Sequence, residues 1–84
     1  ELAPDQAAYL DTYGWILFKT GKIKDAHKYI KKSLEIDDGN IEVLMHMGDI
    51  LVKMKKPTEA KKYYQKALSL DPENQELLDK VNDL

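Results

Sequence analysis

The sequence predicts an all-α fold built from pairs of antiparallel helices that repeat along the chain. Three observations support this prediction: a period of 34 residues, apolar side chains spaced three and four residues apart, and turn-forming residues between the segments with that spacing. A chain of 84 residues forms one small domain and is too short for a second hydrophobic core. We therefore expect each helix pair to bury its apolar face against the next pair.

The period is visible when the sequence is compared with itself. Residues 7–40 align with residues 41–74 without a gap, and about 13 of the 34 aligned pairs are identical. We therefore treat the two segments as copies of one structural unit. The identical pairs include Leu10 with Leu44, Gly14 with Gly48, Ile16 with Ile50, Leu17 with Leu51, Ala26 with Ala60, Tyr29 with Tyr63 and Asn40 with Asn74.

Each unit contains two segments with the apolar spacing of a helix. Gly21 suits the end of the first helix because glycine adopts left-handed backbone angles without strain. Pro57 suits the first turn of the fourth helix, where its missing N–H costs nothing. The turns before the third and fifth helices are Asp37-Asp38-Gly39-Asn40 and Asp71-Pro72-Glu73-Asn74, which supply turn formers and side chains that can cap the helix that follows. The predicted helices cover about residues 6–20, 23–37, 40–54, 57–70 and 74–84.

Small residues recur where the two helices of a unit are expected to meet. Gly14 and Gly48 lack a Cβ, and Ala26 and Ala60 carry only a methyl group. We expect the helices of each pair to approach closely at these positions, where a larger side chain would push them apart.

These features resemble the tetratricopeptide repeat family. The resemblance covers nearly the whole chain, and it implies a right-handed superhelical α-solenoid of antiparallel helix pairs, with two repeats and a C-terminal capping helix. The residues that carry it are Leu10, Tyr13, Gly14, Leu17, Gly21, Ala26, Ile30, Ser33 and Asn40 in the first unit, and Leu44, Met47, Gly48, Leu51, Ala60, Tyr64, Ala67 and Pro72 in the second.

Five positions depart from the family pattern. Leu10 and Leu44 stand where the family often has tryptophan, and Ser33 replaces a usual alanine. Asp38 replaces a usual proline, and Lys55 replaces a usual glycine. We expect none of these substitutions to prevent the fold.

The two ends of the chain define the predicted organisation. Residues 1–6 read like residues 69–74, two periods later, so we expect an array that continues upstream. Apolar residues continue a helical stripe at the other end, but Asn82 replaces the small residue expected there, which is typical of a solvated cap near the end of an array. The stripe consists of Leu77, Leu78, Val81 and Leu84. The expected units are residues 1–6 as the tail of a preceding repeat, 7–40 and 41–74 as two tetratricopeptide repeats, and 75–84 as a capping helix.

Composition argues against several classes of function. The net charge is −2, every basic residue is lysine, and there is no cysteine, so we expect neither nucleic-acid binding nor a thiolate site. His27 and His46 lie in different predicted helices without metal-ligand spacing, and no phosphate-binding loop or nucleophile motif is present. No apolar run is long enough to span a membrane. We expect no enzyme activity, no cofactor and no metal.

A binding function follows from the resemblance. In the family the first helices of each pair line a concave groove that takes peptide segments, which implies that this chain binds a protein or peptide segment. Asp11, Trp15 and Phe18 share a helix face beside the core stripe, in agreement with this placement. Glu76, Asp79 and Asp83 could extend the groove. The predicted groove residues are Asp11, Trp15, Phe18, Lys19, Met45, His46, Asp49 and Val52.

The charge of this groove predicts the kind of ligand. The family's carboxylate clamp for chaperone C-termini needs lysine and asparagine, and the matching positions here hold Asp11, Trp15 and His46. We therefore expect a segment with lysine or arginine beside apolar anchors rather than an acidic tail.

Three alternatives stay open at this level. The indole of Trp15 could pack against a neighbouring unit instead of facing the groove. The chain could be a helical accessory region of a larger enzyme or of a secretion or assembly machine. Apolar residues that an upstream helix would cover, at Leu2, Tyr9, Tyr13 and Ile16, could instead support self-association.

Overall fold

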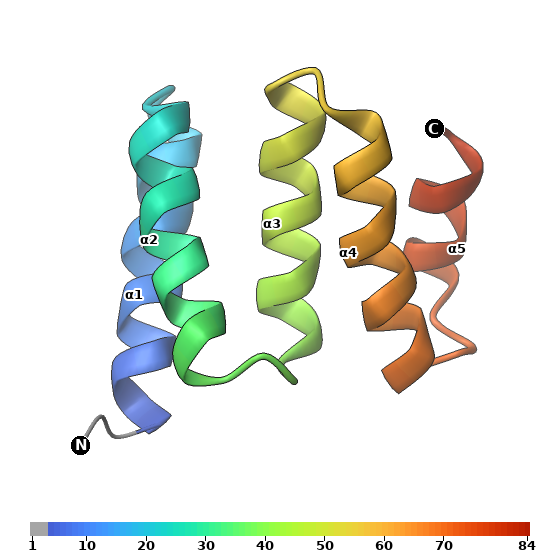
Figure 1. Cartoon of the computed structure of the whole chain (residues 1–84), viewed down its shortest axis with the longest axis horizontal. Helices are drawn as coiled ribbons and strands as arrows, with labels where there is room; N and C mark the ends of the chain where they lie inside the picture. Colours follow the sequence, from blue (N-terminus) through green and yellow to red (C-terminus); the bar gives the residue numbers. More distant parts are fainter. Residues whose placement is uncertain (1–3) are drawn as a thin grey trace.

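The structure is an array of five helices that follow one another in chain order (Figure 1). The computed structural model describes residues 4–84, and this part of the chain contains no strand. The predicted all-α solenoid of antiparallel helix pairs is confirmed. The helices are α1 (Pro4–Lys19), α2 (Ile23–Ile36), α3 (Ile41–Lys53), α4 (Pro57–Leu70) and α5 (Gln75–Asn82).

The helix ends confirm that the predicted turns supply capping side chains, and the structure identifies which residues these are. The side chain of Asn40 accepts a hydrogen bond of 3.2 Å from the backbone N–H of Val43, and Asn74 accepts one of 3.1 Å from Leu77. Each asparagine therefore satisfies one of the N–H groups that the first turn of a helix leaves without a backbone partner. Pro57 occupies the first turn of α4, as predicted.

Each turn within a helix pair contains one residue with left-handed backbone angles. Gly21 has a φ of 88°, which confirms its predicted role, and Lys55 has a φ of 63° at the equivalent position of the second repeat. Both turns close with the same hydrogen bond, from Lys22 N–H to the carbonyl of Leu17 at 2.8 Å and from Lys56 N–H to that of Leu51 at 2.9 Å. The turn is thus conserved in shape although one copy lacks glycine.

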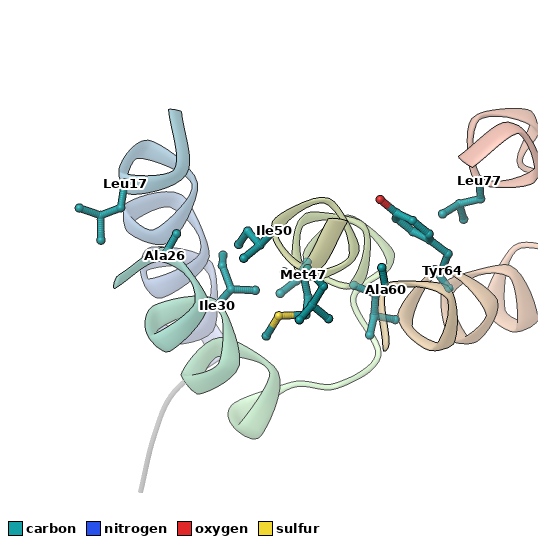
Figure 2. Packing of buried hydrophobic residues seen from close by; sticks show 12 residues of the cluster. Leu17, Ala26, Ile30, Met47, Ile50, Ala60, Tyr64 and Leu77 are labelled. Carbon is teal, nitrogen blue, oxygen red and sulfur yellow. The ribbon is translucent and has the colours of Figure 1, made fainter. Parts of the chain in front are cut away.

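The hydrophobic core runs along the array between successive helices. α1 packs on α2, α3 on α4, α2 on α3 and α4 on α5. Figure 2 shows Ile30 pointing from α2 toward Ile50 and Met47 of α3, and all three side chains are fully buried. Stability therefore comes mainly from contacts between neighbours in sequence, as in other repeat proteins.

The two glycines of the first helices lie where the helix pairs touch. A Cβ at Gly14 would come within 2.8 Å of the Ile30 side chain and 3.3 Å of the Ala26 carbonyl oxygen. A Cβ at Gly48 would overlap the ring of Tyr64. The close approach predicted at both positions is present, and in each case the nearest neighbour is a large side chain of the partner helix.

Ser33, which stands where the family usually has alanine, is also accommodated. Its side chain is fully buried in α2, and its hydroxyl donates a 2.7 Å hydrogen bond to the carbonyl oxygen of Ala7. The buried hydroxyl is therefore satisfied and also ties α2 to α1.

The two ends differ in part from the prediction. α1 begins at Pro4, earlier than expected, and residues 1–3 with Leu2 lie outside the described part of the chain. In α5, Leu77 is fully buried and Val81 packs against the core, but Leu78 and Leu84 are exposed. Of the four residues of the predicted stripe, two therefore contact the core, and within residues 4–84 α5 packs mainly against α4.

Candidate functional site

The predicted groove residues fall into two clusters, one at each junction between successive first helices. The first cluster joins α1 to α3, and the second joins α3 to α4 and α5. Met45 belongs to neither cluster, since its half-buried side chain packs against the hydrophobic core.

An aromatic stack forms the centre of the first cluster. The indole of Trp15 lies 3.9 Å from the imidazole of His46, with an angle of 14° between the ring planes. It also stacks on Phe18 at 4.8 Å and 18°, and the ammonium of Lys19 lies 5.1 Å from its centre. Trp15 therefore packs on a side chain of the next repeat, and it is fixed by side chains on several sides.

A hydrogen bond holds His46 in this stack. Its Nδ1 donates to the carboxylate of Asp11 over 2.7 Å, and each of the two side chains is only 13% exposed. The bond links α1 to α3 and orients the imidazole parallel to the indole. Asp11 therefore acts within the protein, as a positioning group, and is not an open carboxylate on the surface.

A hollow of about 250 Å³ lies beside this stack. We call it the first hollow. Trp15 gives it an apolar wall, and Glu42 adds a carboxylate that forms no ion pair with any lysine of residues 4–84. Its lining residues are Asp11, Thr12, Trp15, Ile16, Glu42 and His46.

Asp49 is the centre of the second cluster. One of its carboxylate oxygens accepts a short hydrogen bond from the hydroxyl of Tyr64 in α4 and a 3.0 Å hydrogen bond from the ammonium of Lys80 in α5. Lys80 also lies 5.8 Å from the centre of the Tyr64 ring. Three helices thus meet at one carboxylate, whose charge is matched by a lysine.

The environment of this cluster favours the neutral phenol. Burial raises the pKa of Tyr64 well above its usual value, and the hydrogen bond to Asp49 and the charge of that carboxylate raise it further. The hydroxyl therefore remains a hydrogen-bond donor throughout the physiological pH range.

A second hollow, of about 260 Å³, lies next to this cluster. Val52, which is 42% exposed, and Leu84 form its apolar wall. Asp83 contributes a carboxylate that is not paired with a lysine within residues 4–84. The lining residues are Asp49, Val52, Tyr64, Lys80, Asp83 and Leu84.

The two junctions use equivalent positions with different chemistry. Trp15 and His46 are 31 residues apart, and so are Asp49 and Lys80. A shift of one 34-residue period moves the first pair onto the second. A stack of two rings at the first junction is therefore replaced by an ion pair at the second.

Sequence reasoning missed several residues of these clusters. Tyr64 and Lys80 were not among the predicted groove residues, and neither were Glu42 and Ile16. Lys80 lies one period after the predicted groove residue His46, so the repeat could have identified it as an equivalent position. Tyr64 offered none, because it comes from a second helix and was interpreted as core. Of the three acids expected to extend the groove, Asp83 lines the second hollow, Asp79 accepts a hydrogen bond from Gln75 and Glu76 is exposed.

Within residues 4–84, no three histidine, cysteine, aspartate or glutamate side chains are placed to share a metal ion. His27 lies on α2, where burial and the charges of Lys31 and Lys56 lower its pKa. None of the helices in this part of the chain is long and apolar enough to cross a membrane. The side chains of the two clusters offer stacking, apolar contact and charge.

Comparison with known proteins agrees with this architecture. Models of the tetratricopeptide repeat match residues 7–40 and residues 41–74. A TPR repeat-containing protein of Pseudomonas aeruginosa is 39% identical over 49 residues, which are 58% of this chain and 8% of that protein. The chain thus spans a small part of the length of this relative.

A solved structure is similar over almost the full chain. It is the first TPR of Spaghetti (RPAP3) bound to the HSP90 peptide SRMEEVD, and the TM-score is 0.62. The similarity covers 98% of this chain and 92% of the other at 20% sequence identity, so it supports the fold alone. With two matched repeats that cover most of its length, the chain belongs to the tetratricopeptide repeat family.

Proposed function

We propose that this chain is a protein-interaction module that binds a peptide or protein segment along α1, α3 and α5 and catalyses no reaction itself. The observation that carries the proposal is the pair of hollows at successive junctions of the array. Each combines an apolar wall with one carboxylate that is not paired with a lysine of residues 4–84. Two similar hollows in succession suit an extended segment that contacts both.

Trp15 is the main apolar anchor in this proposal. Its ring is held by His46 and Phe18, so little side-chain entropy remains to be lost when a ligand binds. Rigid aromatic side chains in partly buried sites contribute strongly to binding energy. The second hollow offers Val52 and Leu84 for a smaller aliphatic contact.

Charge favours a ligand that carries lysine or arginine. Asp11 and Asp49 already bind His46 and Lys80, so the carboxylates available to a ligand are those of Glu42 and Asp83. The similar solved structure binds an acidic HSP90 peptide. In this chain the same kind of peptide would bring its carboxylates toward Glu42 and Asp83 and would be repelled.

Titration of Trp15 fluorescence tests the proposal directly, because Trp15 is the only tryptophan. The probes are heptapeptides with lysine beside leucine or tyrosine, and the acidic peptide SRMEEVD. We expect the basic peptides to bind more tightly, and we expect Glu42→Gln to weaken their binding by about three-fold to tenfold through loss of one charge contact.

Glu73→Gln is the matched control, because Glu73 lies in the exposed turn before α5 and lines neither hollow. It removes the same charge and should leave the affinity unchanged. Equal losses for Glu42→Gln and Glu73→Gln would mean that only net charge matters. Preference for SRMEEVD would contradict the proposed ligand chemistry.

A further inference from the structure

α1 exposes three apolar side chains that have buried equivalents in the next repeat. Tyr9, Tyr13 and Ile16 are 71%, 43% and 54% exposed. We call them the N-terminal face. Their equivalents one period later, in the same order, are Val43, Met47 and Ile50, which are 3%, 0% and 0% exposed.

The second helix of the preceding repeat is what covers the equivalent face of α3. α2 packs along α3, with Ile30 pointing toward Ile50 and Met47 (Figures 1 and 2). The molecule therefore contains one occupied copy of this face and shows the kind of element that fits it: an amphipathic helix with aliphatic side chains on one side.

A hollow beside the N-terminal face leads to the same conclusion. It has a volume of about 490 Å³ and is lined by Leu10, Lys32, Glu35 and Ile36. One period later, Leu44 and Lys66 line a hollow of about 220 Å³, which Leu34 and Asp38 of the preceding repeat also line. Side chains from the end of α2 thus reduce the space beside Leu44. The equivalent space beside Leu10 stays open.

The sequence around the start of α1 provides an independent indication. Leu2 and Pro4 match Leu70 and Pro72 two periods later, in the segment that ends α4 and connects it to α5. The residues at 1–6 therefore have the sequence pattern of a connection between repeats.

We infer that the second helix of a further tetratricopeptide repeat packs on the N-terminal face. This further repeat precedes residues 7–40 in the same polypeptide. That helix resembles α2 in chemistry: it places an aliphatic side chain near Tyr13 and Ile16, as Ile30 does near Met47 and Ile50, and another in the hollow beside Leu10, as Leu34 does at the next junction. A second copy of the chain is the competing occupant.

An extended chain tests this inference. Residues 7–40 are duplicated and placed directly before residue 7, in place of residues 1–6, which keeps the 34-residue register. Tyr9→Lys, made at the original position, is then compared in the 84-residue chain and in the extended chain. We expect almost no effect in the first, where the side chain is exposed, and a fall of roughly 1 M in the urea midpoint in the second, where it becomes buried.

Val52→Lys is the matched control, because Val52 is also exposed but lies at the second hollow. Its effect should be the same in both chains. Equal effects of Tyr9→Lys in the two chains would overturn the inference. So would a dimer of the 84-residue chain in sedimentation that Tyr9→Lys dissociates, because the occupant would then be a second copy.

A crosslinking experiment in the natural polypeptide tests the source of the helix. A photoreactive benzoylphenylalanine replaces Tyr9, and the crosslinked residue is mapped by mass spectrometry. We expect a crosslink within one chain, to a residue N-terminal to Glu1. Crosslinks between two copies, or to a different protein, would contradict a preceding repeat.

Discussion

Gly21 and Lys55 occupy the same place in the two repeats, at the turn between the helices of a pair. Both have positive φ angles, 88° and 63°, and both are followed by the same backbone hydrogen bond. Glycine adopts this conformation freely, whereas the Cβ of lysine comes close to the backbone there. The second turn therefore keeps its shape at a conformational cost that the first does not have.

Lys55→Gly should stabilise the protein. The substitution removes the strained contact of the Cβ with the backbone, which stabilises the folded chain. The higher flexibility of glycine in the unfolded chain offsets part of this stabilisation. We therefore expect the free energy of unfolding to rise by about 0.5–1 kcal/mol. Urea denaturation measures the change. Lys56→Gly is the control, because Lys56 has a φ of −123° and should lose stability instead. A fall in stability for Lys55→Gly would show that the turn does not strain this residue.

At the scale of the helix pair, the two glycines have different neighbours. Gly14 faces the end of the Ile30 side chain, which can rotate, and the carbonyl oxygen of Ala26. Gly48 faces the ring of Tyr64, which is held by its hydrogen bond to Asp49. Glycine thus avoids a clash in both pairs. The neighbouring side chain can move in the first pair, and it is held in place in the second.

Gly48→Ala should therefore cost more stability than Gly14→Ala. Both gain about 1 kcal/mol in helix propensity, and overpacking costs about 1–3 kcal/mol. We expect a net loss of about 1–2 kcal/mol at Gly48 and of less than about 1 kcal/mol at Gly14, measured by urea denaturation. Gly39→Ala is the control, because a Cβ there comes no nearer than 3.7 Å to Asp37. Equal losses at Gly14 and Gly48 would show that the Tyr64 ring moves as easily as the Ile30 side chain.

At the scale of the whole molecule, polar contacts supplement the sequential packing of the helices. Asp11 and His46 link α1 to α3, and Asp49 links α3 to α4 and α5 through Tyr64 and Lys80. The Asp11–His46 and Asp49–Lys80 bonds connect successive units of the array on the side of the proposed ligand. The proposed binding face and the stacking of the array therefore depend on some of the same side chains.

The raised pKa of Tyr64 predicts a loss of stability at high pH. The unfolded chain releases this proton near pH 10, whereas the folded chain retains it to higher pH. The contribution is thus complete below pH 10 and is lost as the pH rises above 10. Urea midpoints at pH 8 and pH 11 measure it. Tyr64→Phe should reduce the decrease, and Tyr63→Phe, at the half-buried tyrosine next to it, should not. An equal decrease in both variants would contradict the assignment.

The sequence alone predicted most of the fold. The 34-residue period, the turns before the third and fifth helices, Gly21 and the paired glycines specify which segments are helices and where they meet, and the structure agrees to within a few residues. These features depend on residues that are near in sequence or repeat at a fixed spacing. For this reason a single sequence contains the information.

The candidate site could be predicted only in part. The resemblance to the repeat family placed candidate residues such as Trp15 and His46 on the first helices, and the helical spacing showed that Trp15 lies on a face beside the core stripe. The tertiary structure alone decided that Asp11 is engaged by His46, and that Asp49 is engaged by Tyr64 and Lys80. These pairs come from different helices, and their distances depend on how the helices stack. Stacking therefore determines which charges remain for a ligand, and composition cannot show this.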